Sequence, residues 1–202
     1  MLFIAVDVHY LDEGGARAAM VAAVDERFSQ VVRTQTAMVS AVEPYRPGEF
    51  YRRELPPLRA VIPSPDELAL IVVDGYVDLD PHGRPGLGAH VHAEFGVPVI
   101  GVAKTAFGTA THAARVLRGQ SSRPLYVTAA GMTIADAAVL VTEMAGRFRV
   151  PDALKRVDRL ARGLELPNAR PRELPRRIAA SQGPDRRRRR ATRVLSGPTA
   201  GR

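Results

Sequence analysis

The sequence predicts an α/β fold: a mixed sheet, in which an antiparallel meander is followed by parallel strands, flanked by helices. Residues 70–73 form an unbroken apolar and mostly β-branched run. Such a run is typical of a strand buried on both faces, and therefore of a sheet covered by helices. Before it, three strand-like segments are joined by short turns, as in an antiparallel meander. After it, strands and helices alternate, which favours added parallel strands.

Each element follows from its local pattern. Strands are predicted over residues 2–8, 16–24, 28–39, 66–74, 97–103 and 124–130, and helices over residues 49–62, 89–95, 134–148 and 151–164. Pro56 and Pro57 fall inside the first of these helices. Because an interior proline removes a backbone donor and clashes with the preceding turn, we expect that helix to restart there with proline in its first turn.

Composition predicts one domain and a tail. A chain of 202 residues with 46% hydrophobic content can bury one sizeable core. Residues 1–164 contain 18 basic and 18 acidic residues, whereas residues 165–202 contain 11 arginines and 3 acids, so the tail holds the whole net charge of +8. We expect residues 1–164 to form the domain and the Pro- and Arg-rich residues 165–202 to be disordered. Phosphate contact of low sequence specificity is the expected function of the tail.

Several classes of site are excluded by composition. The chain contains no cysteine, which excludes disulfides, thiolate nucleophiles and cysteine-ligated metals. No signal-peptide pattern follows Met1, and no apolar run is long enough for a membrane span. We expect a cytoplasmic protein without membrane contact, and a monomer. Lys104 and Lys155 are the only lysines.

Three acidic residues point to a metal site. Asp7 lies at the end of the first predicted strand, Asp74 ends the buried strand, and Glu54 lies in the predicted helix between them. If the two strands are neighbours, both aspartates reach one ion, and Glu54 completes an oxygen cage of the kind that Mg²⁺ prefers. The alternative is that the three acids are unrelated and that Asp74 caps the turn at Gly75.

Ordered motifs resemble those of the endonuclease V, or deoxyinosine 3′ endonuclease, family. They are Val6-Asp7-Val8 with Gly15-Ala16-Arg17-Ala18-Ala19, Pro44-Tyr45-Arg46-Pro47-Gly48, Arg53-Glu54-Leu55-Pro56, Val73-Asp74-Gly75 and Gly101-Val102-Ala103-Lys104. The resemblance continues more weakly through residues 124–127 to about residue 148, and the tail has no counterpart in it. It implies an RNase H-like fold.

The resemblance also implies roles for single residues. The family's metal carboxylates fall on Asp7, Glu54 and Asp74, and its site lysine falls on Lys104. The family's wedge, which enters the nucleic acid at the lesion, falls on four successive residues: Pro44, Tyr45, Arg46 and Pro47. Metal ions polarise a phosphodiester and stabilise the leaving oxygen, and an aromatic side chain fills the gap left by an extruded base.

The chain departs from the family pattern at two places. Asp80 stands where the family loop has a histidine followed by proline, so His82 is a candidate to take that role, while His90 falls where the family has a histidine near the site. The family's Gly-His motif is assigned to Gly131-Met132. A thioether is a poor ligand for Mg²⁺, and Asp136 is either a substitute for the missing group or a favourable charge at a helix N-terminus.

The resemblance implies a metal-dependent endonuclease that cleaves a phosphodiester 3′ to deoxyinosine or a similar deaminated base in DNA. Mg²⁺ is the expected cofactor, and Mn²⁺ is expected to substitute for it. The alternatives are a weakened or inactive homologue that binds nucleic acid without cutting it, and an endonuclease directed to inosine in RNA.

Overall fold

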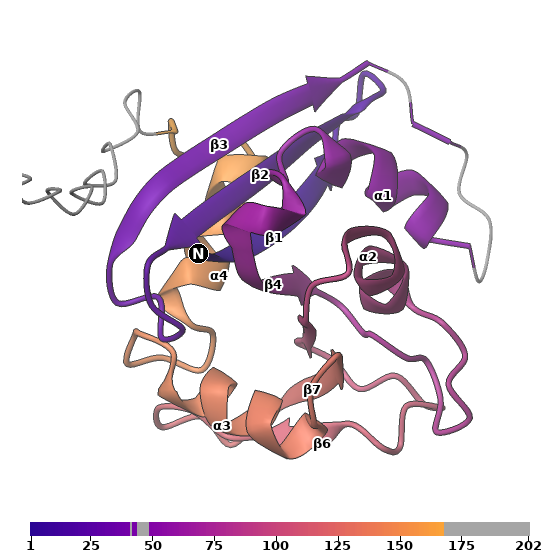
Figure 1. Ribbon diagram of the computed structural model, residues 1–202, viewed down its shortest axis with the longest axis vertical. Helices are drawn as coiled ribbons and strands as arrows, with labels where there is room; N and C mark the ends of the chain where they lie inside the picture. The colour runs from indigo at the N-terminus through magenta and orange to yellow at the C-terminus, as the bar shows by residue number, and fades with distance from the viewer. Residues whose placement is uncertain (41, 44–48, 168–202) are drawn as a thin grey trace, which may run out of the picture. The chain divides into compact units, whose positions relative to one another are not determined.

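The computed structural model describes residues 1–40, 42, 43 and 49–167, and a seven-stranded mixed sheet forms its centre (Figure 1). The strand order is β3-β2-β1-β4-β5-β7-β6. The strands are β1 (Leu2–Tyr10), β2 (Ala16–Ala23), β3 (Val31–Val39), β4 (Leu68–Asp74), β5 (Val99–Ala103), β6 (Ala114–Val116) and β7 (Leu125–Ala130). The predicted α/β class and the opening antiparallel meander are confirmed.

The middle of the sheet is parallel. β1 pairs in parallel with β4, with Val6 opposite Val73, and β4 pairs in parallel with β5, with Asp74 opposite Val102. All five residues of β5 are buried, as are Ile71, Val72 and Val73 of β4. These strands are apolar throughout because both faces of the sheet are covered.

Two pairs of helices cover the two faces (Figure 1). Helices α1 (Tyr51–Arg59) and α2 (Leu87–Phe95) pack on one face, and α3 (Ile134–Glu143) and α4 (Asp152–Ala161) on the other. A short 3-10 turn, η1 (Pro65–Glu67), precedes β4. Helix α4 lies against β1 and β2, whereas α3 lies against β6 and β7. The most amphipathic helix, α4, therefore covers the strand that contains Asp7.

Helix α1 corrects the prediction of a restart at the proline pair. It runs without a break from Tyr51 to Arg59 with Pro56 and Pro57 inside it. The prolines remove two backbone donors, but Leu55, Pro57 and Leu58 are buried against the sheet. Burial of this apolar face offsets the lost hydrogen bonds, because tertiary packing contributes most of the stability of a short helix.

The second half of the chain also differs from the prediction. β7 pairs antiparallel with β5 and with the short strand β6, which was not predicted. No helix connects β5 to β7, so the crossover that a parallel pair needs is missing. Helix α3 ends at Glu143, short of the predicted residue 148, and residues 144–151 form a separate loop.

Two predictions concern the end of the domain at residue 164 and the absence of a membrane span. Glu165 accepts a hydrogen bond from Arg156 at 2.8 Å, so ordered contacts extend just past the predicted boundary at residue 164. The remainder of the predicted tail, residues 168–202, lies outside the described residues. Within the described ranges, every helix is too short or too polar to cross a bilayer.

Candidate active site

Asp7 and Asp74 lie side by side at the centre of the sheet. Val6 of β1 pairs with Val73 of the adjacent parallel strand β4, and Asp7 and Asp74 are the next residues on the two strands. Neighbouring strands are about 4.8 Å apart, so the two carboxylates occupy neighbouring positions. Burial, followed by the charge of Asp74, raises the pKa of Asp7 to about 7. The backbone N–H of Val8 donates to Asp7 Oδ1 at 2.8 Å.

Glu54 approaches the same place from helix α1. It is 7% exposed, although it is charged and lies on a short surface helix. Burial, together with the charges of Asp7 and Asp74, raises the pKa of Glu54 well above its usual value. Burial and the charge of Glu54 also raise the pKa of Tyr10. The structure therefore brings the three predicted carboxylates into mutual electrostatic contact.

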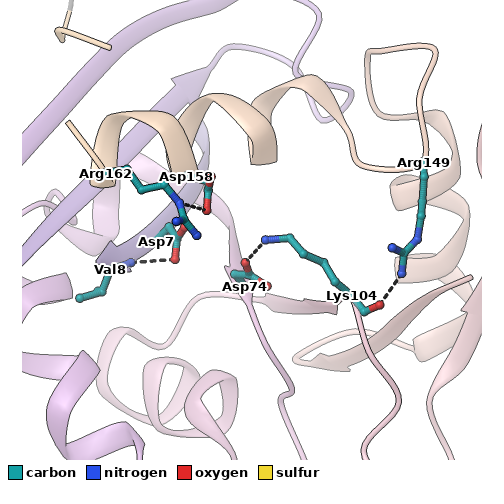
Figure 2. Close-up of polar contacts among 7 residues, drawn as sticks. All are labelled: Asp7, Val8, Asp74, Lys104, Arg149, Asp158 and Arg162. Carbon is teal, nitrogen blue, oxygen red and sulfur yellow. Dashed lines mark hydrogen bonds and ion pairs between the residues drawn. The ribbon is translucent and has the colours of Figure 1, made fainter. Parts of the chain in front are cut away.

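Lys104 supplies the positive charge of the site. Its Nζ atom lies 2.5 Å from Asp74 Oδ2, in a part-buried ion pair (Figure 2). Burial disfavours the charged amine, but the hydrogen bond and the charge of Asp74 outweigh it and raise the pKa of Lys104. The Arg149 guanidinium donates to the backbone carbonyl of Lys104, and to that of Pro124 at 2.8 Å.

Asp158 belongs to this group and was not predicted. It lies on helix α4, and its charge contributes to the raised pKa of Asp7. Arg162 donates to Asp158 Oδ1 at 3.0 Å, and Figure 2 shows both side chains beside Asp7. The sequence contained a signal for Asp158, which comes four residues after Leu154 and three before Ala161. Leu154 and Ala161 are both buried, so Asp158 falls on the inward side of an amphipathic helix.

The acidic cluster of Asp7, Glu54, Asp74 and Asp158 suits a divalent cation by its chemistry. Neighbouring negative charges contribute to the raised pKa values of Asp7 and Glu54, a cation would stabilise these carboxylates, and carboxylate oxygens are the ligands that Mg²⁺ prefers. Within the described part of the chain, however, no three Asp, Glu or His side chains are arranged as a formed metal site. In this arrangement Asp74 is paired with Lys104.

An apolar pocket of about 380 Å³ opens beside Asp74. It is lined by Phe50, Tyr51, Asp74, Gly75, Tyr76, Leu79, Pro85, Gly86, Leu87 and Phe107. The ring centroids of Tyr76 and Phe107 are 5.9 Å apart. The Tyr76 hydroxyl donates to the carbonyl of Thr105 at 2.8 Å and accepts from the N–H of Phe107 at 3.0 Å. The aromatic wall is thus fixed to the segment that follows Lys104.

Two glycines allow the backbone around this pocket to pack closely. A Cβ atom on Gly101 of β5 would lie 2.7 Å from the carbonyl oxygen of Gly75 and 2.8 Å from the amide nitrogen of Val77. A Cβ atom on Gly86 would lie 2.6 Å from the carbonyl oxygen of Tyr76. The chain after Asp74 can therefore fold back over β5 only with glycine at these positions.

The predicted accessory histidines lie at different distances from this arrangement. His90 of helix α2 stacks on Tyr51, a pocket residue, with ring centroids 3.5 Å apart, and burial lowers its pKa. His82 is exposed in the turn after Asp80, where its backbone N–H donates to Asp80 Oδ1 at 2.9 Å. His90 supports the pocket wall, whereas no contact links His82 to the acidic cluster.

Met132 and Asp136 lie at the other end of β7 from the acidic cluster. Ala130, just before them, pairs with Val99 at the start of β5, whereas Asp74 pairs with Val102 near its end. Three residues of strand correspond to about 10 Å. Met132 packs with the core under α3, and the side chain of Asp136 accepts a hydrogen bond from Thr133, the N-cap of α3. Asp136 is therefore a capping residue and does not replace a missing ligand.

The four wedge residues predicted from the sequence, Pro44, Tyr45, Arg46 and Pro47, lie outside the described residues. The described chain resumes at Glu49. Phe50 and Tyr51, which come directly after this gap, line the pocket beside Asp74. The proposed wedge segment is thus joined in sequence to the wall of the pocket.

Arg118 fixes the loop of residues 144–151 between α3 and α4. It is 6% exposed, and its guanidinium donates to the carbonyls of Met144, Gly146 at 3.0 Å and Phe148 at 2.9 Å. Longer contacts reach the carbonyls of Thr142 and Arg149, at 3.3 and 3.4 Å. Through this loop Arg118 supports Arg149, whose guanidinium donates to the backbone carbonyl of Lys104. It also supports the start of α4, the helix that contains Asp158.

Comparison with known proteins points to one family. The family model for endonuclease V matches residues 1–123. Endonuclease V of Streptomyces avermitilis is 32% identical over 178 residues, covering 78% of this chain and 77% of the relative. A crystal structure of endonuclease V from Streptomyces avermitilis has a TM-score of 0.66, with 28% identity and 81% of each chain covered.

A second solved structure is similar in fold. Endonuclease V of Ciona intestinalis, in complex with a 23mer DNA containing an inosine followed by a ribo-adenosine, has a TM-score of 0.67 at 19% identity. The match covers 81% of this chain and 84% of that one. These neighbours have the RNase H-like fold, so the fold implied by the sequence motifs is confirmed.

Proposed function

Because this chain belongs to the endonuclease V family, we propose that it is a metal-dependent endonuclease that cleaves a phosphodiester 3′ to deoxyinosine, or to a similar deaminated base, in DNA. One observation supports this proposal above the others. An apolar pocket with an aromatic wall opens directly beside the acidic cluster and includes Asp74 in its lining. A base held in the pocket brings its neighbouring phosphate to the carboxylates.

The pocket suits a flat, uncharged base. Tyr76 and Phe107 offer π-faces to a base, and the rest of the lining is largely apolar. Enzymes that act on a base in a duplex move it out of the stack into such a pocket. We propose that Tyr45, with Pro44, Arg46 and Pro47, fills the gap that the base leaves, which offsets part of the unstacking cost.

We propose Mg²⁺ as the cofactor, with Mn²⁺ as a substitute, held by Asp7, Glu54 and Asp74. When bound, such an ion polarises the phosphodiester and stabilises the leaving oxygen. Asp158 faces Asp7 from α4 and adds negative charge to the same place. Lys104 moves its compact charge between Asp74 and the phosphate, while Arg149 keeps its backbone in place.

The alternative of an inactive homologue was motivated by Met132 and by Asp80. Met132 follows β7 at the end far from Asp74 and packs against the apolar cluster that includes α3, which argues against a missing ligand at that position. An acid on α4, Asp158, is present at the acidic cluster instead. The observations thus favour an active enzyme over a protein that binds nucleic acid without cutting it.

Cleavage of inosine-containing DNA tests the proposal directly. We expect the protein to nick the strand 3′ to inosine with Mg²⁺ or Mn²⁺, and to leave the adenosine-containing strand intact. Asp74→Asn should lower the rate by at least about a thousandfold, because it removes a charge at the reacting phosphate. Equal cleavage of both strands, or equal rates for the variant, would contradict the proposal.

A binding measurement tests the metal separately from activity. Mg²⁺ should raise the melting temperature of the unaltered protein, because a ligand that binds only the folded state stabilises it. Asp7→Asn should abolish most of that rise. An unchanged response in the variant would remove Asp7 from the proposed ligands.

A further inference from the structure

The apolar pocket beside Asp74, which is proposed to hold the base, is called the base pocket below. A second hollow lies on the other side of Lys104 from it. It has a volume of about 560 Å³ and is lined by Gln120, Ser121, Phe148, Arg149, Val150 and Lys155. Its residues come from the segment before β7, the loop of residues 144–151 and helix α4. Nothing in the acidic cluster or the base pocket uses these side chains, except that Arg149 holds the carbonyl of Lys104.

The hollow combines an exposed aromatic ring with positive charge. Phe148, in the loop of residues 144–151, is 53% exposed. Lys155 Nζ lies 4.3 Å from the centre of its ring, and the guanidinium carbon of Arg147 lies 4.9 Å from it. Asp152 is the acid paired with Lys155, at 2.8 Å. Two cations, Lys155 and Arg147, thus lie at one ring, and one acid is paired with Lys155.

The hollow and the acidic cluster are joined through Lys104. The backbone of Lys104 is held by Arg149, which lines the hollow, and its amine reaches Asp74, which lines the base pocket. Figure 2 shows Arg149 and Asp74 at opposite ends of Lys104. Lys104 thus contacts one lining residue of each: Asp74 of the base pocket and Arg149 of the hollow.

We propose that this hollow binds the nucleic-acid strand on the 3′ side of the cut, within about four nucleotides of the cleaved phosphate. This inference rests on the proposed function, since the cut 3′ to the base sets the direction of the strand. Lys155 and Arg147 contact phosphate, and the Phe148 ring with Val150 contacts sugar or base. Aromatic rings beside cations are the usual way to hold a single strand without reading its sequence.

The experiment varies the flanks of the substrate. Single strands containing inosine are prepared with a 3′ flank of about two or about twelve nucleotides, at a constant 5′ flank, and the reverse pair is prepared with the 5′ flank varied. The full chain is compared with Phe148→Ala and Lys155→Gln. We expect each variant to raise KM about tenfold on the long 3′ flank, with kcat within about twofold, and to leave KM unchanged on the short 3′ flank.

Salt dependence gives a second readout. Lys155→Gln should reduce the slope of log Kd against log salt by about 0.7 for the long 3′ flank, because one phosphate contact is lost. Arg115→Gln, which removes an exposed arginine of β6, serves as the control and should change neither KM nor the flank dependence. Phe148→Tyr should retain the KM of the unaltered protein, because it keeps the ring.

The outcomes separate this inference from the proposed function. Three results for Phe148→Ala and Lys155→Gln would overturn the strand-binding inference while the unaltered protein still cuts. They are a rise in KM that is equal for both 3′ flanks, a rise that follows the 5′ flank, and no rise at all. If the unaltered protein cuts nothing, the proposed function fails. The same strands then test the hollow by fluorescence anisotropy without metal, with the same dependence on the 3′ flank expected of Kd.

Discussion

Asp7 stands in the middle of β1 with Asp74, Glu54 and Asp158 around it, and its protonation is therefore linked to folding. Its pKa is about 7 in the folded protein, above the ordinary value of 3.8 that applies to the unfolded chain. A carboxyl with a raised pKa stabilises the fold fully below the unfolded value. That contribution is lost as pH rises through about 7, where the buried group must ionise.

We therefore expect Asp7→Asn to stabilise the metal-free protein at pH 8, by roughly 1–3 kcal/mol in the free energy of unfolding, and to have little effect at pH 4. Urea unfolding in the presence of a chelator measures this difference. Asp12→Asn, in the exposed turn between β1 and β2, is the control and should be neutral at both pH values. A variant that is less stable than the unaltered protein at pH 8 would contradict the expected linkage.

Gly101 offers a test of close packing beside Asp74. Gly101→Ala places a methyl group against the backbone of Gly75 and Val77, which cannot move as a flexible side chain does. We expect a loss of about 1–3 kcal/mol in the free energy of unfolding and a lower cleavage rate, because the chain after Asp74 shifts. Gly108→Ala is the matched control, since no atom lies within 4 Å of the added methyl. Similar stabilities for the two variants would show that the backbone relaxes easily.

At the scale of elements, the loop between α3 and α4 depends on one buried arginine. Arg118→Lys keeps the charge but replaces the planar set of donors by a single ammonium, leaving several of the loop carbonyls without a partner. We expect a loss of about 2–4 kcal/mol in the free energy of unfolding and faster hydrogen exchange over residues 144–149. Arg115→Lys, on an exposed position of β6, should change neither. Unchanged exchange in Arg118→Lys would mean that the loop is held by other contacts.

Sequence patterns predict some elements of this fold well and others poorly, for physical reasons. The strand that ends in Asp74 was predictable because a strand buried on both faces leaves a continuous apolar run. The helix over residues 49–62 was also predicted, but its unbroken course through Pro56 and Pro57 was not, because the burial that offsets these prolines comes from contacts with distant residues. The antiparallel direction of β7 likewise depends on how residues 104–124, between β5 and β7, fold.

The candidate site was predictable where an acid ends a buried strand, as at Asp74, and where a family motif marks an acid, as at Asp7, although β1 continues past Asp7 to Tyr10. Asp158 was missed because an acid next to an apolar stripe resembles the solvent face of a helix until the packing of α4 on β1 is known. Met132 was assigned to the position of a missing site histidine through the family's Gly-His motif, because the register of β7 could not be known from its sequence. A sequence pattern locates a residue along its strand or helix, whereas the order of the strands in the sheet decides which strand ends lie close together.

For the whole molecule, charge is divided between the domain and the residues after it. Residues 1–164 are balanced, whereas residues 165–202 hold the net charge of +8. Replacing the five arginines of residues 186–190 by glutamine should weaken binding to DNA of any sequence and reduce the slope of log Kd against log salt by up to about 4. The discrimination between inosine and adenosine strands should remain. A change in that discrimination would place base recognition in the tail.

Lys104 already neutralises Asp74 in the metal-free protein, and so the site has a counter-ion of its own. On the proposed function, a divalent cation that binds Asp74 would replace Lys104 as the partner of that carboxylate. The released ammonium would then be available to the phosphate. Metal binding and substrate binding would be coupled through this one side chain, so each should strengthen the other.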